Sequence, residues 1–109
     1  MCLNYYDVMY VPNTDAPVIE QPQHDTEVSL IGSSVTLQCR AAGYGSLVYY
    51  WERKTSENWI TVANNKTSYT ARTSGQYRCN VTNGAVSVIS PVITVYGKNV
   101  WVYITRSAV

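Results

Sequence analysis

Two cysteines with aromatic residues at short distances from them constrain the fold of this chain more than any other feature. Trp51 lies twelve residues after Cys39, and Tyr77 lies two residues before Cys79. Each cysteine belongs to a run in which apolar and polar residues alternate, over residues 35–39 and 77–81. Successive side chains of a strand point to opposite faces, so each thiol is expected to share a sheet face with its hydrophobic neighbours.

The rest of the chain also favours short strands separated by turns. Residues 17–22 are flanked by prolines, which confines them to an edge strand, and residues 27–31 are expected to continue that strand after a kink. No segment has the helical period. The other predicted strands cover residues 34–41, 47–53, 59–63, 67–71, 76–82 and 85–96.

The last two of these strands are expected to form a hairpin. Asn83 and Gly84 stand between two alternating runs, and this pair favours a type I′ turn, which needs positive φ at both residues. Pro91 lies inside the final strand and cannot donate a ladder hydrogen bond. The sequence therefore predicts a bulge or a change of pairing partner there, with the strand at an edge of its sheet.

The 109 residues, of which 46% are hydrophobic, suffice for one domain. We place it at residues 16–97, after a flexible segment or linker over residues 1–15. In the tail, residues 98–109, the stretch 100–105 is predicted to return as the second strand of a hairpin and to pair with an edge, within the domain or between copies. The alternatives are a linker to a following domain or stalk, or vector-derived residues. The last three residues, Ser107 to Val109, also fit a PDZ-ligand pattern, which conflicts with an oxidising location.

Three features of the chain resemble the immunoglobulin superfamily. They are the spacing of Cys39, Trp51 and Tyr77, the run from Ser74 to Cys79, and the closing Ser-Pro-Val at residues 90–92. The gap between Trp51 and Cys79 is too short for the extra strands of an antibody variable domain, so the chain resembles the intermediate or constant-2 sets. The chain resembles Fc-receptor-like domains in residues 33–40, in residues 67–69 and in the Ser-Pro-Val ending. One departure is Thr73, because the family usually has aspartate there, and the connection before it is short.

The resemblance implies an all-β, immunoglobulin-like antiparallel β-sandwich of seven to eight strands. It implies one inter-sheet disulfide between Cys39 and Cys79, with Trp51 packed against it and Tyr77 forming the tyrosine corner. Disulfides persist in oxidising compartments, so we expect an extracellular location, as the ectodomain of a membrane protein or secreted. Cys2 is left over, and we expect it to be a free or intermolecular thiol or a vector-derived residue.

Charge and motifs argue against several classes of function. A net charge of +1 gives no field that would attract nucleic acid or anionic lipid, and the longest apolar stretch is far shorter than a membrane span. The only histidine, His24, lies in a predicted loop without a nucleophile pattern, so we expect no enzyme. No ligand spacing for a metal and no cradle for a cofactor are present in the sequence.

Two glycosylation sequons begin at Asn65, on a predicted turn, and at Asn80, within a predicted strand. Asn80 follows the inward-pointing Cys79 and therefore points outward. It is expected to share its sheet face with Tyr50, Glu52 and Arg78. A glycan on Asn80 would shield that face and direct recognition to loops, whereas an unmodified Asn80 would leave the face open.

The candidate ligand contacts are Tyr50, Glu52 and Arg78 on the sheet face and Tyr44 and Asn83 in loops. Trp59 is expected to be part of the core. Together these observations predict a non-catalytic extracellular recognition module of a cell-surface receptor or adhesion protein, with a protein ligand or counter-receptor as partner. The alternatives are a passive spacer in a multi-domain chain, or a secreted protein whose copies associate through the tail.

Overall fold

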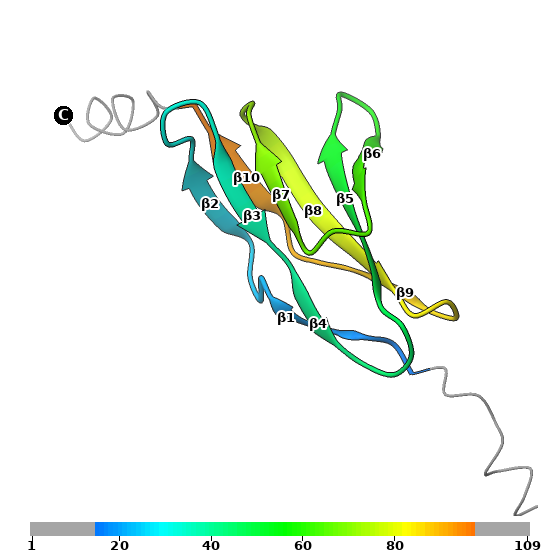
Figure 1. Cartoon of the computed structure of the whole chain (residues 1–109). Coiled ribbons are helices and arrows are strands. Elements are labelled where there is room, and N and C mark those ends of the chain that lie inside the picture. The colour runs from blue at the N-terminus through cyan, green and yellow to red at the C-terminus, as the bar shows by residue number, and fades with distance from the viewer. Residues whose placement is uncertain (1–14, 98–109) are drawn as a thin grey trace, which may run out of the picture.

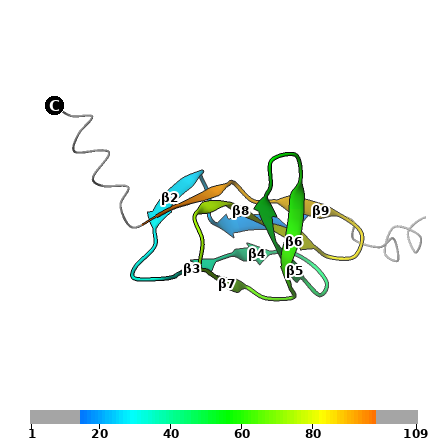
Figure 2. The ribbon, with the colours of Figure 1, turned by 90° about the horizontal axis from the view of Figure 1, so that it is seen from above.

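A computed structural model describes residues 15–97, which form ten strands in two layers and contain no helix. The first layer pairs β1 (Val18–Gln21) with β4 (Arg40–Ala42), and β3 (Val35–Gln38) with β7 (Ser68–Ala71). The second layer has the order β2 (Thr26–Ser29), β10 (Ile93–Tyr96), β8 (Gly75–Thr82), β5 (Val48–Lys54) and β6 (Trp59–Asn64), and β9 (Ser87–Ile89) also pairs with β8. Figure 2 shows β3, β4 and β7 in one layer and β2, β8 and β9 in the other. The predicted all-β sandwich is confirmed, whereas the predicted linker 1–15, apart from its last residue, and the tail 98–109 lie outside the described residues.

The strand count exceeds the expected seven to eight because three predicted strands are interrupted. The strand predicted over residues 34–41 becomes β3 and β4, with Cys39 between them still paired through its N–H to the carbonyl of Thr67 at 2.8 Å. The first and last predicted strands divide beside Pro22 and Pro91, which have no N–H to give to a ladder. The interruptions therefore follow from local chemistry and leave the sandwich intact.

The first strand changes layers at its interruption. β1 pairs with β4 in one layer, whereas β2 pairs with β10 in the other, from Thr26 opposite Ile93 to Ser29 opposite Tyr96. This second pairing is parallel, so the sandwich is antiparallel apart from one strand pair. It also means that β10 lies between β2 and β8, and the expectation that the last strand is an edge is wrong for β10. The sequence could not reveal this, because the pairing joins opposite ends of the domain.

The core is centred on the Cys39–Cys79 disulfide and three aromatic rings. The two Cα atoms of the bridge are 6.4 Å apart, and Trp51, which is 0% exposed, lies directly opposite Cys79 in the ladder. The Tyr69 ring packs between Trp51 and Tyr77, with centroid distances of 6.2 Å and 5.7 Å. The indole N–H of Trp51 donates to the carbonyl of Lys66 at 2.9 Å, so its burial leaves no polar atom unpaired. The predicted Cys39–Cys79 disulfide and the predicted packing of Trp51 beside it are thus present.

A tyrosine corner joins the start of β8 to the preceding connection, with Thr73 in place of the usual aspartate. The Tyr77 hydroxyl donates to the Thr73 carbonyl at 2.9 Å and lies 3.0 Å from the Thr73 hydroxyl. Arg53 donates from Nε to the Tyr77 hydroxyl and from Nη2 to the carbonyl of Ser74, at 3.3 Å and 3.1 Å. Gly75 has φ of 150°, and a Cβ there would lie 3.2 Å from Arg53 Nη2, which explains the glycine.

The predicted irregularity at Pro91 is a one-residue change of register between β9 and β10. Asn80 lies opposite Ile89, whereas Tyr77 lies opposite Ile93. Ser90, which is buried, bridges the gap: its N–H donates to the Cys79 carbonyl at 2.8 Å, and its Oγ accepts from the Cys79 N–H at 2.9 Å. The side chain thereby replaces a ladder partner beside the disulfide.

We expect Ser90→Ala to lower the free energy of unfolding by about 1–3 kcal/mol, because it leaves the buried N–H of Cys79 without an acceptor. Urea denaturation checks this value, with Ser87→Ala on the exposed side of β9 as the matched control. The control is expected to stay within about 0.5 kcal/mol of the parent. Equal losses for both variants would show that the Ser90 hydroxyl has no structural role.

Candidate interaction surface

The layer of β2, β10, β8, β5 and β6 presents a broad face to solvent, which we call the outer face. Trp51, Cys79 and Val81 point into the core, so the residues that alternate with them on β5 and β8 point outward. In the ladder Tyr50 lies opposite Asn80, and Glu52 lies opposite Arg78. The structure thus brings together all four residues for which the sequence predicted a shared outward face.

Arg78 is the centre of this face. Its Nε donates to Glu52 Oε1 at 2.6 Å, and the two side chains are only 21% and 14% exposed. The Arg78 guanidinium carbon also lies 4.1 Å from the centroid of the Trp59 ring, and Lys54 Nζ lies 5.6 Å from the same ring. A guanidinium stacked on an indole and held by a carboxylate is a rigid arrangement with a defined planar surface.

Trp59 therefore belongs to the outer face, and the expectation that it is part of the core is wrong. It is half-buried and pairs with Lys54 at the end of the β5–β6 ladder, beyond the residues that cover the disulfide. Its apolar surface is covered instead by the side chains of Arg78 and Lys54. No signal in the sequence places Trp59 there, because its face depends on the β5–β6 register, which contains a bulge between Trp51 and Glu52.

A second row on the outer face runs through Tyr50, Asn80 and Ile89 on neighbouring strands. Ile89 is 50% exposed on β9, which among the described strands pairs only with β8. Asn80 is half-buried between them, and its Oδ1 is buried without a hydrogen-bond partner. The oxygen of the second sequon is therefore closed off from solvent, although the residue points outward as predicted.

The predicted loop contacts differ from each other in structure. Tyr44 is 65% exposed in the connection between β4 and β5, so its ring is accessible. The polar atoms of the Asn83 side chain are engaged instead: Nδ2 donates to the Asp15 carbonyl, and Oδ1 accepts from the N–H groups of Ala85 and Val86, each at 2.9 Å. Asn83 shapes its own loop, and contact with a ligand through it stays a prediction.

The β8–β9 connection is a tight hairpin, but its turn differs from the predicted type I′. The N–H of Asn83 donates to the Val86 carbonyl at 3.2 Å, which makes these two residues the closing pair and leaves Gly84 and Ala85 as the central residues. Only Gly84 has positive φ, at 93°, which is the φ pattern of a type II′ turn. The expectation of positive φ at Asn83 is wrong, because the Asn83 side chain organises the turn.

The first sequon and the histidine that was not expected to be catalytic both lie at the surface. Asn65 is exposed on the turn between β6 and β7 with φ of 54°, a conformation that asparagine tolerates. His24 is also exposed, in the connection between β1 and β2. Among residues 15–97 no three His, Cys, Asp or Glu side chains lie close enough together to hold a metal ion.

Comparison with known proteins agrees with this architecture. Residues 16–96 match the family model described as immunoglobulin domain. The chain belongs to the immunoglobulin domain family. No curated protein sequence matches it at a significant level.

Several solved immunoglobulin-type structures resemble this domain. The structure of the RIG-5 IG1 homodimer has a TM-score of 0.58 and 18% identity, and the match covers 77% of this chain and 99% of that one. The BTLA ectodomain has a TM-score of 0.55 and 10% identity, with 75% and 98% covered. The complex of Dpr2 Ig1-Ig2 with DIP-Theta Ig1-Ig3 has a TM-score of 0.56 and 24% identity, with 74% and 32% covered. Sequence identities of 10–24% support a shared fold. Immunoglobulin folds are generally non-catalytic.

The immunoglobulin domain has one ionisable contact at the β2 edge of the outer face. The Tyr96 hydroxyl donates to Glu27 Oε2 at 3.1 Å. This hydrogen bond, the carboxylate charge and burial, in that order, raise the pKa of Tyr96 above its ordinary value. The phenol therefore remains protonated and continues to donate to Glu27 throughout the physiological pH range.

Within the described residues no helix is long and apolar enough to cross a membrane.

Proposed function

We propose that this immunoglobulin domain is an extracellular recognition module that binds a protein, a ligand or a cell-surface counter-receptor, through its outer face. The observation that carries the proposal is the cluster of Arg78, Trp59 and Glu52 beside the exposed Ile89. Tryptophan, tyrosine and arginine are the residues most enriched at the centres of protein interfaces. Here they are held in place by the fold, so binding would immobilise few side chains.

The extracellular location is supported by the disulfide and by the nature of the similar structures. Disulfides such as Cys39–Cys79 form and persist in oxidising environments and are rare in reducing compartments. One similar structure is an ectodomain, and two others are assemblies of immunoglobulin domains, a homodimer and a complex between different proteins. They favour a protein partner for this domain without specifying which protein it is.

The sequons decide whether the outer face is open. We expect Asn65 to carry a glycan, because it is exposed on a turn, and Asn80 to be unmodified, because it is half-buried within a strand, between Tyr50 and Ile89 of the neighbouring strands. Expression in glycosylating cells followed by mass mapping of both peptides measures the occupancy, with Asn65→Gln as the control that removes the expected glycan. A largely occupied Asn80 would cover the outer face and make the exposed loop residue Tyr44 the better candidate contact.

We expect Ile89→Asp and Trp59→Ala each to weaken binding by roughly 30-fold, the effect of losing about 2 kcal/mol at a hot spot. The assay displays the full chain at high density on beads and measures pairwise binding to a panel of cell-surface ectodomains that includes the chain itself. Ile31→Asp is the matched control, because Ile31 is 80% exposed but lies in the turn after β2.

Two outcomes would contradict the proposal. Equal weakening by Ile31→Asp and Ile89→Asp would mean that the outer face is not the contact. Binding to no ectodomain of the panel, with all variants folded, would favour the alternative function of a passive spacer in a multi-domain chain.

A further inference from the structure

Opposite charges stand toward the two edges of the outer face. Lys54 on β5 and Glu27 on β2 belong to one row of side chains, which crosses the sheet through Gln76 on β8 and Thr94 on β10. Both charged side chains are exposed, and the ion pairs of residues 15–97 include neither of them. Three strand spacings, about 14 Å, separate β5 from β2, so Lys54 and Glu27 are too far apart to pair within one copy.

The row of Tyr50, Asn80 and Ile89 is also arranged about β8. β5 pairs with one edge of β8, whereas β9 and β10 pair with the other edge. Tyr50 and Ile89 therefore lie one strand spacing from Asn80, on opposite sides of it. Tyr50 is half-buried, and Ile89 is 50% exposed. The two sides of β8 thus present different apolar surfaces at the same height along the strands.

A two-fold axis that runs along β8 makes these rows complementary. Rotation about it lays a second outer face on the first, exchanges the two sides of β8 and keeps the height along the strands. Tyr50 of one copy then lies over Ile89 of the second copy. Lys54 lies over β10 of the second copy, next to its Glu27. Stacked sheets commonly keep their strand directions within about 30° of each other, so sheets can adopt this arrangement.

The other two-fold axis in the plane of the outer face, perpendicular to the strands, gives no such match. It keeps each strand over the same strand of the second copy, so Lys54 meets β5 and Glu27 meets β2. On β5 the only acid, Glu52, is 14% exposed and already pairs with Arg78, and β2 contains no cation. Exposed opposite charges therefore meet only about the axis along β8.

The residues on this axis are compatible with a second copy. Arg78 meets Arg78 of the second copy, but Glu52 of its own copy compensates its charge, and Trp59 stacks on its guanidinium. Asn80 likewise meets Asn80, and a side-chain amide can both donate and accept hydrogen bonds. The contact requires an unmodified Asn80, which is what its half-buried position within β8 favours.

We propose that the protein partner of the outer face is a second copy of this chain, related to the first by a two-fold axis along β8. Such a dimer uses the face of the proposed function and therefore rests on it. In both halves of the dimer Lys54 pairs with Glu27 of the second copy, and Tyr50 covers Ile89 of the second copy. Oε2 of Glu27 accepts from the Tyr96 hydroxyl, which leaves Oε1 for Lys54.

Sedimentation equilibrium of the full chain tests the dimer, with Cys2→Ser in every variant so that no thiol links two copies. We expect the parent to be a dimer. Lys54→Glu and Glu27→Lys are each expected to raise its Kd at least about thirty-fold, because like charges then meet twice in every dimer. An equimolar mixture of the two variants is expected to recover a dimer of unlike chains, since both contacts again join opposite charges.

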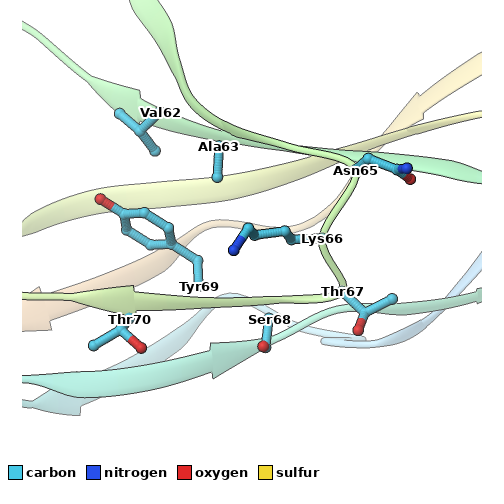
Figure 3. A pocket seen from close by; sticks show the side chains of 8 residues that line it. All are labelled: Val62, Ala63, Asn65, Lys66, Thr67, Ser68, Tyr69 and Thr70. Carbon is cyan, nitrogen blue, oxygen red and sulfur yellow. The ribbon is translucent and has the colours of Figure 1, made fainter.

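Two control variants separate the contact between copies from local effects. Lys66→Glu makes the same charge change in the groove between β6 and β7, where Figure 3 shows the Lys66 side chain, and is expected to keep the parent Kd. Tyr96→Phe removes the hydrogen bond to Glu27 within one copy but keeps the carboxylate, so it is also expected to keep the dimer. Urea unfolding checks that each variant is folded.

A monomeric parent would overturn the dimer, and binding of another ectodomain that Ile89→Asp weakens would then leave the proposed function standing with a different partner. If the parent neither dimerises nor binds an ectodomain, both proposals fail. A dimer that Ile89→Asp and both charge variants leave intact would locate self-association at another surface and overturn this contact. A mixture of folded charge variants that stays monomeric would overturn the arrangement about β8.

Discussion

Replacing both cysteines of the core, Cys39→Ala with Cys79→Ala, is expected to lower the free energy of unfolding by about 4 kcal/mol. The bond closes a loop with a sequence separation of 40 residues, so its loss releases a large conformational entropy to the unfolded chain. Both sulfur positions are almost completely buried, so the substitution also removes contacts with Trp51. A loss of this size is comparable to the whole stability of a small domain.

Urea denaturation at fixed temperature measures this change, with Cys2→Ser as the control for loss of the cysteine that is not part of this disulfide. The control is expected to leave the unfolding midpoint unchanged. Thiol titration of the native parent protein is expected to detect Cys2 alone among its three cysteines. Two further reactive thiols, or a double variant that unfolds within about 1 kcal/mol of the parent, would contradict a stabilising disulfide and with it the extracellular assignment.

Trp51→Ala is expected to destabilise the domain by about 3–5 kcal/mol, because it opens a cavity at the most central position of the core. Trp51 is 0% exposed, stacks on Tyr69 and donates its indole N–H to the Lys66 carbonyl. Its removal thus also leaves that carbonyl without its donor. Thermal and urea unfolding measure the loss.

Trp59→Ala is the matched control for this prediction, since it makes the same chemical change on the outer face. Trp59 is half-buried and is covered by Arg78 and Lys54. We expect it to cost below about 1.5 kcal/mol of stability while it weakens binding. If both tryptophan variants lost stability equally, the outer-face cluster would be a structural element rather than a recognition surface.

Local sequence patterns predict the direction of a side chain on its strand, but not which neighbours it meets from other strands. Alternation of apolar residues around Cys79 correctly predicts that Tyr77 points inward and that Arg78 and Asn80 point outward. It does not reveal that the Asn80 oxygen is buried between Tyr50 and Ile89, because those neighbours come from two other strands. Likewise Asn83 and Gly84 indicate a hairpin, but the turn type depends on hydrogen bonds that the Asn83 side chain makes to later backbone groups.

The sequence by itself determined which side chains of each strand point inward, because burial requires a period of two along a strand, a property of each short segment alone. The sandwich, the disulfide pair and the core positions of Trp51 and Tyr77 were implied by the resemblance to the immunoglobulin superfamily. Only the tertiary structure decided that Trp59 stacks on Arg78, that β2 joins β10 in parallel and that, among residues 15–97, β7 pairs only with β3. These features depend on register and pairing between segments distant in the chain, and the free energies that select them come from contacts absent in any single segment.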